Sequence, residues 1–105
     1  MSEGNKGQYI YQFEAIRPEL ITDPDAWTED DNRIASAHYA YLKEATEEGI
    51  VLLAGRSLDG KGPAVVIFEA ESDDAAGQFM ENDPFVAGGL MRAHLHTFRA
   101  ALVRK

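Results

Sequence analysis

The spacing of apolar residues alternates between two periods along this chain, and the order of the alternation restricts the possible folds. A period of two predicts a strand, and a period of three to four predicts an amphipathic helix. The successive patterns predict the order β-α-β-β-α-β, the ferredoxin-like arrangement of an α+β fold with a four-stranded antiparallel sheet. The expected elements are a strand at 8–16, a helix from Thr28 to about Glu48, strands at 50–54 and 64–70, a helix after Ser72, and a strand at 90–103.

Residues near the expected boundaries fit these elements. Thr28 can cap the first helix, and Gly49 can end it in the left-handed conformation. Residues 19–27 are expected to form a connecting loop that Trp27 holds against the body of the domain. The Asp83-Pro84 step should break the second helix, because a residue before proline avoids the helical region.

The two apolar runs in the middle of the chain indicate how the sheet is covered. Residues 50–54 are expected to form a central strand that is buried on both faces, and residues 64–70 are also apolar on both sides. Both crossover helices should cover the same face of the sheet. The other apolar face then needs a partner, and homodimerisation through the sheets meets that need.

Length and composition exclude several classes of protein. A chain of 105 residues makes one domain, expected at 8–105 after a flexible lead-in at 1–7. The net charge of −8, with acids spread along the chain, argues against a nucleic-acid or anionic-membrane surface. The lack of cysteine excludes disulfides and thiolate chemistry, and no apolar run reaches the ~18 residues of a membrane span. The cytoplasm is the expected location.

His38 lies on the apolar face of the first expected helix. It follows Ile34 by four residues and precedes Leu42 by four, so its ring should point inward. An inward imidazole is either a hydrogen-bonded core residue or a group that lines a cavity and acts there. The spacing alone favours neither alternative.

Asp83 stands where the second expected helix ends. Taken alone, it is more simply a cap or turn residue. Because both helices pack side by side on one sheet face, however, Asp83 can meet His38. A carboxylate bonded to one ring nitrogen would fix the tautomer and leave the other nitrogen free to move a proton.

Three further side chains are weaker candidates. His94 and His96 share one side of the last strand and could bind a divalent metal, but no third ligand is apparent. We therefore expect a solvated or dimer-facing pair there, and no metal site. Arg56 could hold an anionic substrate group, or it could be a strand-end charge in water. No phosphate-binding glycine motif occurs, and no cofactor is expected.

An ordered set of segments resembles the YCII-related domain family over nearly the whole chain. The matching segments are His38–Leu42, Glu48–Gly55, Gly62, Asn82–Phe85 and Gly88–Leu90. The resemblance implies a dimeric α+β barrel akin to muconolactone isomerase, with a site built from the family's histidine and aspartate at His38 and Asp83. A few members of the family act on chlorinated hydroxyquinols as dehydrochlorinases, and the domain also occurs beside sigma-factor and regulatory proteins. Arg56 departs from the family pattern, which usually has proline there, and this difference is expected at the rim of the pocket.

Two functions follow from these observations. The first is a small, cofactor-free enzyme in which His38 and Asp83 transfer a proton on a small organic substrate and Arg56 binds it. Isomerisation, dehydrochlorination or lactone opening would suit such a pair. The second is a non-catalytic homodimeric module that binds a small ligand or a partner protein.

Overall fold

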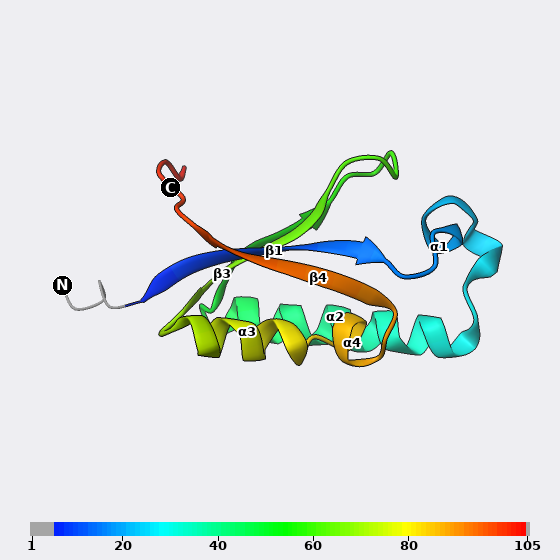
Figure 1. The fold of residues 1–105 in the computed structure, drawn as a ribbon, viewed down its shortest axis with the longest axis horizontal. Helices are drawn as coiled ribbons and strands as arrows, with labels where there is room; N and C mark the ends of the chain where they lie inside the picture. Colours follow the sequence, from blue (N-terminus) through cyan, green and yellow to red (C-terminus); the bar gives the residue numbers. More distant parts are fainter. Residues whose placement is uncertain (1–5, 105) are drawn as a thin grey trace.

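A computed structural model describes residues 6–104, which form one antiparallel sheet with helices on one of its faces (Figure 1). The strands run in the spatial order β2-β3-β1-β4, and every neighbouring pair is antiparallel. This is the expected ferredoxin-like α+β arrangement, and it is confirmed. The elements are β1 (Gly7–Ala15), α1 (Glu19–Thr22), the 3-10 helix η2 (Pro24–Ala26), α2 (Glu29–Glu47), β2 (Val51–Arg56), β3 (Ala64–Ala70), α3 (Asp73–Glu81), α4 (Pro84–Ala87) and β4 (Met91–Phe98).

The long helix α2 begins and ends as its sequence predicts. The Thr28 side chain accepts a hydrogen bond from the Asp31 backbone N–H, and the Asp31 carboxylate accepts one from the Thr28 N–H, which completes a capping box. Beyond the helix, Gly49 has φ +85°, a value that glycine adopts at little cost. Both ends of α2 are therefore defined locally, so the register of its inward face is fixed.

The main core lies between the sheet and the two longer helices. Tyr11, Val66 and Phe68 are fully buried on the helix-facing side of the two central strands, β1 and β3. Leu42 of α2 and Ala76 of α3 pack against this side. Figure 1 shows α2 and α3 on the same side of the sheet, as expected, and no helix formed by residues 6–104 covers the opposite side.

A second cluster anchors the segment between β1 and α2. Leu20, Leu90 and Met91 are its buried members, and Trp27 packs against them. The Trp27 indole N–H donates to the Leu20 carbonyl over 2.9 Å, so Trp27 holds this segment as expected. The segment is not the plain loop that the sequence suggested, because the short helices α1 and η2 occupy it.

The expectation that β2 is a central strand buried on both faces is wrong. β2 is an edge strand, and only its first residue, Val51, is buried. Leu52 and Leu53 are 47% and 54% exposed, beside a register shift between Val51 and Leu53. An apolar run marks a strand with apolar surroundings, but it does not say whether a second strand or a second molecule supplies them.

Two other boundaries differ from expectation. β4 ends at Phe98 and not at Val103, and Leu102 and Val103 are exposed. Of the expected lead-in, residues 1–5 lie outside the described residues, whereas Gly7 already pairs with Ala70 in the sheet. Within residues 6–104, no helix is long and apolar enough to cross a membrane.

Candidate functional site

His38 projects from the middle of α2 toward the sheet. Its side chain is 16% exposed, which agrees with the inward position that its spacing predicted. The ring stacks on Phe85, with 3.7 Å between centroids and 15° between planes. It meets Phe13 of β1 edge-on, with centroids 5.5 Å apart. Two aromatic side chains thus fix the plane of the imidazole.

The structure brings His38 and Asp83 together. Nδ1 of His38 lies 2.7 Å from Oδ1 of Asp83, although 45 residues separate them in the chain. Asp83 is completely buried, and it sits between α3 and α4, where Pro84 begins the next helix. The meeting follows from the fold, since α2 and the α3–α4 junction lie on the same face of the sheet.

Asp83 is both a helix cap and the partner of the histidine. Its Oδ1 accepts a hydrogen bond from the Phe85 backbone N–H over 3.0 Å, the usual role of an aspartate before a helix. The same oxygen faces the His38 ring, and Oδ2 is left for another donor. The two readings of Asp83 that its sequence position allowed are therefore compatible.

That other donor is Tyr11, which the sequence did not single out. Its hydroxyl donates to Oδ2 of Asp83 over 2.9 Å, from the centre of the sheet. Burial, together with the charge of Asp83, raises the pKa of the Tyr11 hydroxyl far above its usual value, so it stays a donor. The alternation of β1 predicts that Tyr11 points inward, but nothing local says which residue its hydroxyl would meet.

This arrangement fixes how the imidazole can act. Because the Asp83 carboxylate accepts from Nδ1, the neutral ring carries its proton on Nδ1 and a lone pair on Nε2. Nε2 can then take a proton from a bound molecule, and the buried carboxylate stabilises the imidazolium that forms. Among the described residues, no fully buried side-chain polar atom lacks a hydrogen-bond partner, so the buried oxygens of Asp83 are both satisfied.

Arg56 forms no ion pair with Asp83 but lies on the same side of the sheet. It pairs with Ala64 of β3, next but one to the buried Val66, so both side chains face the helix layer. Phe13, which touches His38, faces the same layer from β1. Arg56 is exposed and takes part in none of the ion pairs within residues 6–104.

His94 and His96 lie on the opposite, uncovered side of the sheet. Both are exposed, and Nε2 of His94 lies 3.1 Å from a carboxylate oxygen of Glu14 on the neighbouring strand. Within the described part of the chain, no three histidine, aspartate or glutamate side chains are grouped to hold a metal ion. His94 and His96 are thus separated from His38 and Asp83 by the sheet.

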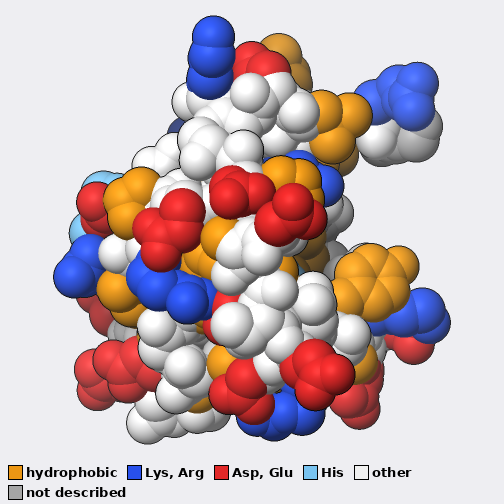
Figure 2. All heavy atoms as spheres, turned by 90° about the vertical axis from the view of Figure 1, so that its right-hand side faces the viewer, with side chains coloured by type: hydrophobic (Ala, Val, Ile, Leu, Met, Phe, Trp, Pro, Cys, Tyr) orange, Lys and Arg blue, Asp and Glu red, His pale blue; other side chains and the backbone are white. Residues whose placement is uncertain are grey.

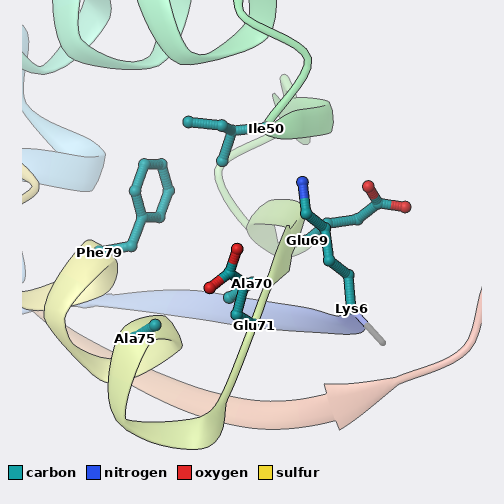
Figure 3. A pocket seen from close by; sticks show the side chains of 7 residues that line it. All are labelled: Lys6, Ile50, Glu69, Ala70, Glu71, Ala75 and Phe79. Carbon is teal, nitrogen blue, oxygen red and sulfur yellow. The ribbon is translucent and has the colours of Figure 1, made fainter. Parts of the chain in front are cut away.

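Two surface hollows lie elsewhere on the molecule. One of about 270 Å³ opens between the ends of β3 and α3, where Ile50 and Phe79 face Lys6, Glu69 and Glu71 (Figure 3). A second, more open hollow of about 630 Å³ lies over the start of α2, around Thr28 and Arg33. Figure 2, which looks at the α1 end of the molecule, shows acidic side chains spread among basic and apolar ones without a single dominant patch. His38 and Asp83 line neither hollow.

Comparisons with known proteins identify a domain family and a solved structure of similar fold. The profile of the YCII-related domain matches residues 18–95, a stretch that contains His38, Arg56 and Asp83. No curated protein matches the chain. A similar solved structure is that of 5-chloro-2-hydroxyhydroquinone dehydrochlorinase from Burkholderia phenoliruptrix AC1100 in complex with 2,5-dihydroxybenzoquinone. The two are 25% identical and superpose with a TM-score of 0.61, over 88% of this chain and 93% of the other.

Proposed function

The chain belongs to the YCII-related domain family, and on this premise we propose that it is a small enzyme in which His38 and Asp83 transfer a proton on a small organic substrate. The reaction would be an isomerisation, a dehydrochlorination or the opening of a lactone. Each needs one base and one stabilising charge, which these two side chains can supply without a cofactor.

The observation that supports this proposal is the 2.7 Å contact between Nδ1 of His38 and Oδ1 of Asp83. The carboxylate is completely buried and is held by two further donors, so it cannot easily turn away from the ring. In the proposed step, Nε2 removes a proton from the substrate, and Asp83 stabilises the charged ring. In an isomerisation the proton returns to another atom of the product. In a dehydrochlorination the electron pair of the broken bond expels chloride, and the ring passes the proton to water.

A planar, oxygen-rich substrate suits the surroundings of His38. The rings of Phe13 and Phe85 flank the imidazole and offer aromatic surface to a flat molecule. Arg56 faces the same layer, about two strand spacings or roughly 10 Å from β1, and we propose that it binds an anionic oxygen of the substrate. The dehydrochlorinase with a bound dihydroxybenzoquinone supports this substrate class.

The test combines turnover with binding. We expect the wild-type chain to release chloride from 5-chloro-2-hydroxyhydroquinone or to turn over a related hydroxyquinone. His38→Gln and Asp83→Asn should lower kcat by about 100-fold or more, the usual contribution of a positioned acid/base group. Binding of 2,5-dihydroxybenzoquinone, followed by its absorbance, should change much less. His96→Gln, on the other side of the sheet, is the matched control and should keep full turnover.

Retention of turnover in both His38→Gln and Asp83→Asn would show that the pair is not the proton-transfer centre. Arg56→Gln tests the third residue separately. It should raise KM for an anionic substrate and leave kcat nearly unchanged, because it is proposed to bind and not to react.

The alternative function is a non-catalytic homodimeric module that binds a small ligand or a partner protein. The observation in its favour is the uncovered face of the sheet, where Ile10 and Ile67 are neighbours and Leu53 pairs with Ile67. Such a module would bind 2,5-dihydroxybenzoquinone without turning over any hydroxyquinone, and His38→Gln would then alter affinity alone.

A further inference from the structure

Tyr11 occupies a position that connects the centre of the sheet to the proposed site. It lies on β1, between β3 and β4, and its side chain is completely buried. Its hydroxyl donates to Oδ2 of Asp83, the carboxylate oxygen opposite the one that faces His38. The two ends of one carboxylate are therefore held by a tyrosine and a histidine.

The ring of Tyr11 is held on several sides, so its hydroxyl has a fixed position. Phe13 and Phe68 meet it nearly edge-on, with centroids 5.4 and 5.5 Å away. Phe79 of α3 approaches from the helix layer at 6.3 Å. In such a close-packed core an aromatic ring has little freedom to tilt. Core packing thus holds the Tyr11 hydroxyl, whose hydrogen bond Asp83 accepts, in place.

We propose that Tyr11 is a positioning residue that sets the orientation of the Asp83 carboxylate and, through it, the tautomer of His38. This inference rests on the proposed function of the pair. Tyr11 does not touch the reacting atoms; it acts on His38 only through Asp83.

The physical reason is the burial of the carboxylate. A charged oxygen away from water needs donors, and a phenol hydroxyl is a strong one that costs no further desolvation. Without it, Oδ2 would have no donor to hold it, and the carboxylate would be free to turn away from the His38 ring toward the Phe85 N–H. The Nδ1–H tautomer of His38 would then lose its preference over the Nε2–H tautomer, which offers no lone pair at Nε2.

Two other tyrosines act as internal controls. The Tyr41 hydroxyl donates to the Phe79 carbonyl over 2.8 Å, near Asp83 but without contact with it. Tyr9 lies two residues before Tyr11, on the same side of β1, and its hydroxyl donates to Asp73 over 2.7 Å. Replacing either tyrosine by phenylalanine removes a hydrogen-bonded tyrosine hydroxyl, partly buried rather than fully buried as at Tyr11, but leaves Asp83 with all its donors.

The experiment measures the tautomer of His38 and the kinetics in Tyr11→Phe and Tyr41→Phe. Long-range proton–nitrogen correlation spectra, recorded where the ring is neutral, report which ring nitrogen carries the proton. We expect the Nδ1–H form in the wild type and in Tyr41→Phe, and a mixture of both forms in Tyr11→Phe. In kinetics, Tyr11→Phe should lower kcat by about tenfold and leave KM nearly unchanged, as expected from the loss of one hydrogen bond to a charge.

A Tyr11→Phe chain with the wild-type tautomer would overturn the inference, and so would equal losses of kcat in Tyr11→Phe and Tyr41→Phe. If His38→Gln keeps full turnover, the proposed function fails, while the tautomer measurement still decides the role of Tyr11. If Tyr11→Phe does not fold, the decision passes to Asp83→Asn. Its amide changes the partner of both Tyr11 and His38, so an unchanged His38 tautomer there would equally overturn the inference.

Discussion

Asp83 carries three hydrogen bonds in a completely buried position, so it is the residue whose loss should cost most. Asp83→Ala would leave the Tyr11 hydroxyl, the Phe85 N–H and the His38 ring without their acceptor. Each buried group left unpaired costs about 1–3 kcal/mol, so the free energy of unfolding should fall by about 3 kcal/mol or more. Urea denaturation measures this loss.

The matched control for this prediction is Asp25→Ala, because Asp25 is an exposed carboxylate in η2. It should change the free energy of unfolding by less than ~0.5 kcal/mol, as is usual at the surface. Similar losses in the two variants would mean that the Asp83 network contributes little to stability.

Asp31 should make stability depend on pH in the acid range. Its carboxylate accepts from the Thr28 N–H over 3.0 Å and from Arg17 over 2.5 Å, and these two donors lower its pKa. A lowered pKa in the folded state adds stability above the unfolded value of ~3.9, and this stability is lost as the pH falls through the folded value. Asp31→Asn should therefore be less stable than the wild type at neutral pH and equally stable in strong acid.

Thermal unfolding of the wild type and of Asp31→Asn, from neutral pH to strong acid, measures the effect. Asp30→Asn is the control, since Asp30 is exposed and pairs only with Arg33 at the surface. A difference between Asp31→Asn and the wild type that persists unchanged at low pH would show that packing at Asp31, and not its charge, is responsible.

Among the elements, the short helix α4 determines whether Asp83 reaches α2. Gly88 ends α4 so close to its neighbours that an added Cβ would lie 2.8 Å from the Pro84 carbonyl and 2.9 Å from Ile34 of α2. Gly88→Ala should thus push α4 away from α2 and lower the free energy of unfolding by about 1–3 kcal/mol, the usual cost of overpacking. Loss of the Nδ1–H tautomer of His38 should accompany it.

Gly77 in α3 offers the opposite case for comparison. An added Cβ there meets nothing within 4 Å, so Gly77→Ala should raise stability by up to ~1 kcal/mol through helix propensity alone. Denaturation of the two alanine variants, side by side, checks both signs. A stable Gly88→Ala chain would mean that the α2–α4 contact is loose.

Elements with local signals could be predicted from the sequence, and those set by distant contacts could not. Thr28 and Gly49 define α2 within a residue, because capping and left-handed turns depend on neighbouring residues. The place of β2 at the edge depends on which strands pair, and an apolar run looks the same in both places. The helices α1 and α4 are four residues each, too short for a periodic pattern to reveal.

The same distinction applies to the site. The meeting of His38 and Asp83 could be predicted from topology, since His38 lies in the middle of α2 and Asp83 at the junction of α3 and α4, on the same face of the sheet. Tyr11 could not, because alternation predicts only that it points inward. The partner of its hydroxyl lies 72 residues away and depends on where α3 ends.

At the scale of the whole molecule, one side of the sheet carries no helix from the described part of the chain, residues 6–104. Across its middle runs a row in which Leu53, Ile67, Ile10 and His96 follow one another from β2 to β4. Leu53 is 54% exposed, and Phe98 of β4 is 38% exposed. A small protein rarely leaves such apolar neighbours in water, and the face of a second sheet could cover them.

We therefore predict that the chain sediments as a dimer at micromolar concentrations, with the two sheets face to face. Ile67→Lys places a charge in the middle of the row and should give a monomer, because a buried unpaired charge opposes association. Tyr39→Lys is the control, since Tyr39 is 69% exposed on α2, in the helix layer on the other side of the sheet, and this variant should remain a dimer. A wild-type monomer, or an Ile67→Lys dimer, would mean that this face stays in water. The apolar run of β2 would then have no partner in solution.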